Sequence, residues 1–167
     1  MGNSVSIILG NGDGAFQPPV DYAVGEGPSS VIAIDVNGDG HKDLAVANED
    51  PEGENFLAGM SITILLNNGD GTFGGQSIFD TSAASGDAVV GDFNGDGKAD
   101  LAVVGGNSQM TDVVSIFQGN GDGTFSGPVS FAAGQGPGYI VAGDLNGDGK
   151  LDLAVTNNGS FFTNFGF

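Results

Sequence analysis

The chain has 167 residues, of which 32 are glycine, none is cysteine and 21 are acidic, against three lysines and no arginine. Its formal charge of −18 at pH 7 repels phosphates and anionic lipids, so we expect no binding to nucleic acid or to an anionic membrane surface. No apolar run approaches the ~20 residues of a transmembrane helix, so we expect no membrane insertion. Abundant glycine without a collagen period, in a chain that is 39% hydrophobic, predicts an all-β protein with many tight turns.

Short apolar runs alternate with turn residues along the whole chain, and no segment sustains a helical period. Runs of this length, bounded by Gly, Asn and Asp, are typical of β-strands. In chain order the expected strands cover residues 5–9, 20–24, 30–34, 44–46, 61–66, 76–79, 87–91, 101–103, 113–118, 129–132, 139–143 and 153–155. Two kinds of turn recur between these strands, and their spacing divides the chain into units.

The first kind of turn is Asn-Gly-Asp-Gly followed by any residue and a phenylalanine, at 11–16, 68–73 and 120–125. Its glycines can adopt positive φ, which predicts a β-hairpin at each place. Phe16, Phe73 and Phe125 end these turns. Because they recur at one position of every unit, we expect them in the core and not in a binding site.

The second kind is a nine-residue pattern, D-x-N-G-D-G-x-x-D, at 35–43, 92–100 and 144–152. Side-chain oxygens at positions 1, 3, 5 and 9, with the carbonyl of position 7, can supply most of the six to eight hard oxygens that calcium prefers. The alternative is that Asp, Asn and Gly merely favour turns, but a plain turn does not need four such oxygens at fixed spacing three times. An EF-hand is excluded because Val46, Val103 and Val155 stand where its acidic position 12 belongs.

The two turns keep a fixed spacing: 24 residues separate the first Asn of one from the first Asp of the other (11 to 35, 68 to 92, 120 to 144). Four short strands then fall within each unit of about 50 residues, which predicts antiparallel blades of a β-propeller. A parallel β-helix is the rival architecture, but its repeats are much shorter.

The strings DVNGDGHKDLAV, DFNGDGKADLAV and DLNGDGKLDLAV, alternating with NGDGxF, resemble FG-GAP/VCBS repeats, which form the blades of integrin-α-type propellers. The resemblance covers nearly the whole chain, from about Val5 to Asn157. It implies one calcium ion in each nine-residue loop, about three per chain, and partner ligands, protein or glycan, on the opposite face. The implied calcium ligands are Asp35, Asn37, Asp39, His41 (carbonyl), Asp43, Asp92, Asn94, Asp96, Lys98 (carbonyl), Asp100, Asp144, Asn146, Asp148, Lys150 (carbonyl) and Asp152.

We expect a single repeat domain over 1–167 with about three blade-equivalents. It divides into a half-blade (1–25), full blades (28–82 and 86–133), a second half-blade (137–158) and an aromatic tail (159–167). Closed propellers typically have four to eight blades, so either the chain self-associates, as a two-fold pair or a fibre, or it is an excerpt of a longer array. The tail is either a degenerate strand on the last unit or a latch for a neighbouring chain.

No residue set suggests catalysis: there is no cysteine, and the one histidine, His41, occupies a position held by lysine in the other copies. We therefore expect no enzyme but a calcium-stabilised extracellular or cell-surface module for adhesion, scaffolding or self-assembly, although the N-terminus shows no signal peptide. A carbohydrate-binding propeller is the alternative, which the lack of Trp disfavours. The acidic insertion at 48–59 is either a solvated loop or a loop that binds a partner or an auxiliary cation.

Overall fold

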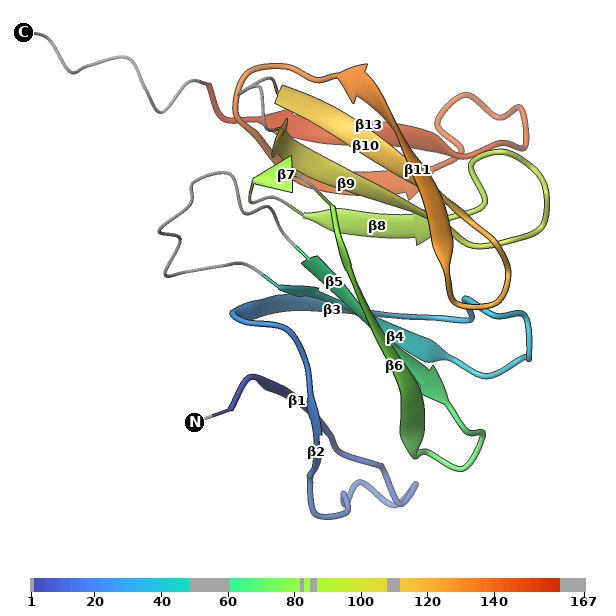
Figure 1. Cartoon of the computed structure of the whole chain (residues 1–167). Helices are drawn as coiled ribbons and strands as arrows, with labels where there is room; N and C mark the ends of the chain where they lie inside the picture. The colour runs from blue at the N-terminus through green and yellow to red at the C-terminus, as the bar shows by residue number, and fades with distance from the viewer. Residues whose placement is uncertain (1, 49–60, 82, 85–86, 108–111, 160–167) are drawn as a thin grey trace, which may run out of the picture.

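The computed structural model describes residues 2–48, 61–81, 83–84, 87–107 and 112–159, and it confirms an all-β fold (Figure 1). Within these ranges every regular element is a strand, and no helix of a length and apolarity that could cross a membrane occurs. Residues 49–60 and 160–167 lie outside the described residues and include most of the acidic insertion at 48–59 and of the tail at 159–167, so the predictions for both stay predictions.

Two antiparallel sheets form the centre of the molecule, each built from consecutive strands. The first has the order β3 (Pro28–Ile34), β4 (Asp43–Asn48), β5 (Ser61–Asn67), β6 (Phe73–Asp80). The second has β8 (Ala88–Gly91), β9 (Asp100–Asn107), β10 (Asp112–Gly119) and β11 (Phe125–Ala132), with the short β7 (Ala83–Ala84) also paired to β9. The predicted four-stranded antiparallel arrangement is thus confirmed.

A two-stranded sheet lies at each end of the described chain. β1 (Ser4–Ile7) pairs with β2 (Val20–Ala23), and β12 (Pro137–Gly143) pairs with β13 (Asp152–Asn157). An Asn-Gly-Asp-Gly hairpin joins β1 to β2, so these two strands correspond to the last two of a complete sheet. A nine-residue loop joins β12 to β13, so these correspond to the first two.

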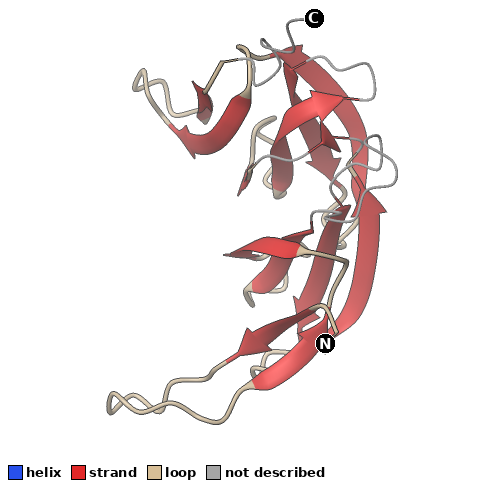
Figure 2. Cartoon of the chain, turned by 90° about the vertical axis from the view of Figure 1, so that its left-hand side faces the viewer, coloured by secondary structure: helices blue, strands red, loops and turns tan. Residues whose placement is uncertain are grey.

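The sheets pack face to face in chain order and form an arc (Figure 2). Three apolar clusters fill the junctions. The first joins β1–β2 to β4 and β5, the second joins the two complete sheets, and the third joins the second complete sheet to β12–β13. Because β4 lies in the middle of this stack, all six of its residues are buried, whereas the same Leu-Ala-Val sequence in β13 is half-exposed.

Several local predictions need correction. β6 and β11 begin at the phenylalanine directly after the hairpin turn, earlier than predicted, because the hairpin pairing extends to the turn itself. β7 was not expected. Phe73 and Phe125 pack against the apolar clusters as predicted, but Phe16 is 68% exposed. The prediction of a core role was wrong for Phe16, because no described sheet packs against that side of β1–β2.

Candidate metal-binding loops

The three nine-residue loops join β3 to β4, β8 to β9 and β12 to β13, and they project from the same end of their sheets (Figure 1). Most of their residues are exposed. The glycines at the fourth and sixth positions have φ between 77° and 87° in all three loops. That left-handed conformation is strained for any residue with a Cβ, so these two positions of the pattern are explained by the backbone itself.

The first aspartate of each loop accepts hydrogen bonds from two glycine N–H groups of the same loop. Asp35 accepts the N–H of Gly38 at 2.7 Å through Oδ1 and the N–H of Gly40 at 2.9 Å through Oδ2. Asp92 and Asp144 make the same pair of bonds. Backbone N–H donors, led by those of Gly97 and Gly149, hold the pKa of Asp92 and of Asp144 below the ordinary value. Both carboxylates are therefore charged at neutral pH.

The third and fifth positions continue this local network. Asn37 Oδ1 accepts the N–H of Asp39 at 3.0 Å, and Asp39 Oδ1 accepts the N–H of His41 at 2.8 Å. The second and third loops repeat both bonds. The His41 N–H is the main cause that lowers the pKa of Asp39.

The ninth position behaves differently, because its aspartate ties the loop to the end of the third strand. Asp43 is fully buried, and it accepts the N–H of Val36 at 3.0 Å and that of Asn67 at 2.8 Å. Asp100 is also fully buried and accepts the N–H of Phe93 at 3.1 Å and that of Gly119 at 2.9 Å. We call this double contact the clasp. Asp152 keeps only the first half of it, to Leu145 at 3.0 Å.

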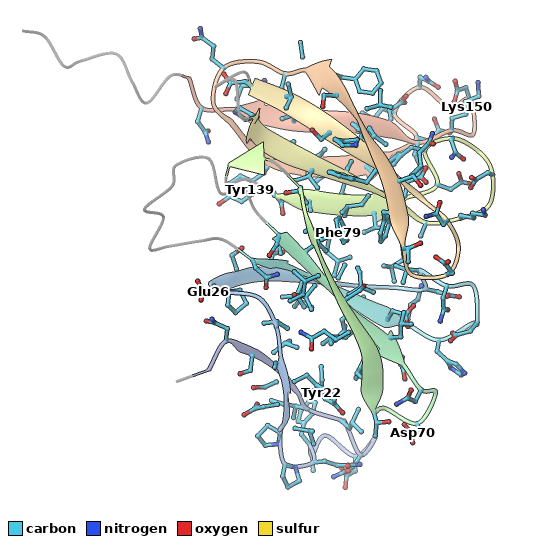
Figure 3. The ribbon with its side chains drawn as sticks, viewed as in Figure 1. Tyr22, Glu26, Asp70, Phe79, Tyr139 and Lys150 are labelled. Atoms are coloured by element: carbon cyan, nitrogen blue, oxygen red, sulfur yellow. The ribbon has the colours of Figure 1, made fainter. Side chains whose placement is uncertain are left out.

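The seventh position lies against the hairpin of its own sheet. A Cβ added at Gly69 would meet the His41 imidazole at 2.7 Å, and one added at Gly121 would meet the Lys98 side chain at 3.3 Å. Figure 3 shows Lys150 at the tip of the third loop and Asp70 at the tip of the β5–β6 hairpin, at the same end of the sheets. Loops and hairpins thus form one continuous edge of the molecule.

The donor set of each loop fits a hard divalent cation. Three carboxylates, an amide oxygen and a backbone carbonyl are ligands that calcium prefers. All three lysines of the chain lie in these loops, one in each. Three aspartates and one lysine give each loop a net charge of −2 (1 − 3 = −2), which one divalent ion would balance.

The side chains are not gathered around one point in this structure. Within the described ranges, no three acidic or histidine side chains lie close enough together to hold an ion. Their oxygens accept the N–H groups of the loop instead, as described above. The loops therefore contain the kinds of oxygen ligand that calcium prefers. In this structure, those side-chain oxygens accept hydrogen bonds from backbone N–H groups.

Comparison with protein families decides what the repeats are. The model of the FG-GAP-like repeat matches residues 2–46, 35–103 and 92–155, which together cover nearly the whole chain. This protein belongs to the FG-GAP-like repeat family. Each match ends at the second strand of a sheet, so the boundaries of the FG-GAP-like repeats fall within the sheets and not between them. No curated protein matches the chain.

Sequence reasoning missed the residues that complete the clasp. Asn67 and Gly119 were not singled out, although each directly precedes the Asn-Gly-Asp-Gly turn. The signal is weak because they contribute only a backbone N–H, so any residue except proline can serve. The residues predicted as ligands occupy the expected loops in all three copies.

Proposed function

We propose that this chain is a calcium-stabilised extracellular module for adhesion, scaffolding or self-assembly, without catalytic activity, and that its sheets are blades of a β-propeller. One observation carries the proposal: the same loop, with the same aspartate-to-amide hydrogen bonds, occurs at the same edge of three consecutive sheets. Each copy also brings three carboxylates, an amide oxygen and a backbone carbonyl into one nine-residue loop, and this is the kind of donor set that calcium prefers.

The residues that would hold calcium are the aspartates and asparagines at positions 1, 3, 5 and 9, with the carbonyl of position 7. Bound calcium would supply two positive charges to a loop whose own net charge is −2. The chain's own contribution is to orient the carboxylates through backbone N–H donors, which also lower the pKa of Asp39, Asp92 and Asp144. The clasp at Asp43 and Asp100 then connects the loop to the buried end of the sheet, so occupancy of the loop bears on the stability of the fold.

Support for propeller blades comes from the order and packing of the strands. Each complete sheet follows the chain order of its strands, and successive sheets stack face to face in an arc (Figure 2). Two complete sheets and two half-sheets amount to about three blades, fewer than a closed ring needs. We include self-association into a two-fold pair or a fibre in the proposal, because a second copy would supply further blades.

An extracellular setting suits loops of this kind, because solvent-exposed calcium sites of modest affinity fill where free calcium is abundant. The end of the sheets away from the loops is the expected place for a protein or glycan ligand. Glu26 and Tyr139 lie at that end in Figure 3, away from Lys150 and Asp70. The Tyr139 side chain is exposed and available for a contact.

Calorimetric titration of the calcium-free chain tests the calcium role. We expect about three calcium ions to bind per chain, and excess chelator to lower the Tm substantially, because each loop then keeps three uncompensated carboxylates. Magnesium is the matched control and should restore the Tm poorly, since its small octahedral shell fits a flexible oxygen-rich loop less well. A Tm that chelator leaves unchanged, with no heat of calcium binding, would contradict the proposal.

A further inference from the structure

The two half-sheets at the ends of the described chain are complementary. β12–β13 has the first two strands of a sheet and leaves the outer edge of β13 without a described partner. β1–β2 has the last two strands and leaves the outer edge of β1 without one. The half-sheets lie at opposite ends of the molecule (Figure 1), so they do not meet within one copy.

We propose that β1–β2 of a second copy adds to β13 and completes a sheet of order β12-β13-β1-β2. This inference rests on the self-assembly part of the proposed function and names the strands that carry it. In a complete sheet, the residue three before the hairpin's first Asn pairs with the Leu of Leu-Ala-Val, as in Leu44↔Leu65 and Leu101↔Phe117. The same count places Ile8 of the second copy opposite Leu153, and Ser6 opposite Val155.

The clasp supports this register independently. In both complete sheets the ninth aspartate accepts the N–H of the residue directly before the hairpin turn, Asn67 or Gly119. The corresponding residue at the N-terminal hairpin is Gly10. Hydrogen bonds join its neighbours to the other arm, Gln17 N to Leu9 O and Asn11 N to Ala15 O, while within the described residues the Gly10 N–H makes none. Asp152 Oδ1 likewise has no described donor, so the two groups fit each other.

Aromatic contacts between neighbouring sheets give a third line of support. Tyr22 contacts Phe73 with ring centroids 5.5 Å apart, and Phe79 contacts Phe125 at 5.2 Å. In each pair, the first residue lies 11 positions after the first Asn of one hairpin turn (11 to 22, 68 to 79). The second residue lies five positions after the first Asn of the next hairpin turn (68 to 73, 120 to 125). The next pair in this series is Phe131 with Phe16 of a second copy.

Both members of that third pair are exposed in the single chain. Phe131 is 58% exposed and Phe16 is 68% exposed, whereas Phe73, Phe79 and Phe125 pack against apolar clusters. Phe79, labelled in Figure 3, lies between the complete sheets and also contacts Phe117 at 5.8 Å. Ile8, 52% exposed, is the counterpart of Phe117.

An apolar groove marks the place where the second copy would enter. It has a volume of about 620 Å³ and lies between β10–β11 and β13, with Val129, Phe131, Leu153 and Val155 in its lining. Between the two complete sheets, Phe117 and Phe125 occupy the equivalent space. The side chains of Ile8 and Phe16 from a second copy are apolar and stand at the matching positions of the repeat.

Each copy offers one hairpin and one acceptor edge, so two copies related by a two-fold axis satisfy both and make six blades. The mass of the calcium-loaded chain in solution tests this. We expect twice the 16.6 kDa of one chain for the wild type. Phe131→Asp and Phe16→Asp should each give a monomer, because each places a charge in an apolar contact. Ile78→Asp, at a similarly exposed residue of β6 (52%), is the matched control and should leave the pair intact.

Mixing the two blocked variants sharpens the test. Phe131→Asp keeps a normal hairpin and Phe16→Asp keeps a normal groove, so together they should form one intact contact and a 1:1 pair. Since both residues are exposed, circular dichroism should show unchanged folding in each variant. If both variants keep the wild-type mass, the strand assignment is wrong although self-assembly stands. A wild type that stays monomeric at high micromolar concentration overturns self-assembly as well.

Disulfide capture tests the register, because the chain has no cysteine of its own. We expect Val155→Cys mixed with Ser6→Cys, or Ala154→Cys mixed with Ile7→Cys, to form a covalent pair under mild oxidation. Directly opposite residues place their Cα atoms within the 4.4–6.8 Å that a disulfide needs. Val155→Cys mixed with Asp21→Cys on β2 is the control and should not crosslink. Equal crosslinking of the control would overturn the register.

Discussion

The same four residues, Asn-Gly-Asp-Gly, occur six times in this chain and fold in two different settings. In the β5–β6 hairpin, Asp70 accepts the N–H of Thr72 at 2.9 Å, and Asn68 N–H closes the turn on the Thr72 carbonyl. In the loops the central aspartate makes the same local contact, as Asp39 does with His41. The tetrapeptide thus sets the turn in both settings.

What separates the two settings is the pair of aspartates that flank the tetrapeptide in the loops. Asp35 adds two bonds to glycine N–H groups, and Asp43 adds the clasp. The hairpins have neither of these aspartates, and they close on one backbone bond and on local side-chain bonds such as that of Asp70 with Thr72. A short motif therefore determines local geometry, whereas the residues on either side of it determine whether the turn can hold a cation.

The largest effect should come from removing a clasp. Asp100→Ala leaves the N–H groups of Phe93 and Gly119 without an acceptor at a buried site, which should lower the free energy of unfolding by about 2–5 kcal/mol. Asp122→Ala, in the hairpin of the same sheet, should cost less than about 1 kcal/mol because Asp122 is exposed. Urea denaturation of both variants measures the difference. Equal losses of unfolding free energy would show that the clasp stabilises the fold no more than a hairpin aspartate does.

An intermediate effect should follow from removing a proposed ligand that makes only local bonds. Asp96→Ala should reduce the calcium stoichiometry by one and make the Tm less sensitive to chelator, because its loop loses a carboxylate ligand. Asp122→Ala changes the same residue of an identical tetrapeptide in the hairpin and should leave the stoichiometry unchanged. Calorimetry of the two variants side by side distinguishes them, and identical stoichiometries would remove the functional difference between the settings.

The smallest effect concerns the hairpin aspartates. The Thr124 hydroxyl, and then its N–H, lower the pKa of Asp122. A lowered folded-state pKa contributes stability that is complete above the ordinary aspartate pKa of about 3.9 and is lost as the pH falls through the lowered value. Thr124→Val should therefore raise the pKa of Asp122. A carboxyl NMR titration measures this, with Asp70 as the internal control, whose own hydroxyl partner is Thr72.

The sheets could be predicted from the sequence, but the exposure of side chains on the two end sheets of the molecule could not. Strand positions follow from apolar runs between glycine-rich turns, so the antiparallel sheets were predictable to within a few residues. Exposure was not, because Phe16 and Phe73 occupy the same position of the repeat and differ only in whether a sheet precedes them. Position in a repeat predicts a contact only when the neighbouring unit is present.

The loops show a similar division. Their location and donor residues were predictable from spacing, since the pattern occurs three times in the same frame. The burial of Asp43 and Asp100 was not, because it depends on the end of a strand about 20 residues further along the chain (43 to 67, 100 to 119). Spacing in the sequence identifies which side-chain oxygens lie near one another. Tertiary contacts decide how many backbone N–H groups donate hydrogen bonds to those oxygens.

The boundaries of the FG-GAP-like repeats do not coincide with those of the sheets, and this affects how the protein unfolds. Successive FG-GAP-like matches overlap at residues 35–46 and 92–103, so the first residues of β4 and of β9 belong to two repeats. Because β4 pairs with both β3 and β5, and β9 with both β8 and β10, each central sheet joins strands of successive repeats. In nearest-neighbour descriptions of repeat proteins, such a unit has little intrinsic stability and a large coupling to its neighbours. Strong coupling makes partly unfolded arrays rare, so the two central sheets should melt in a single cooperative transition instead of one repeat at a time.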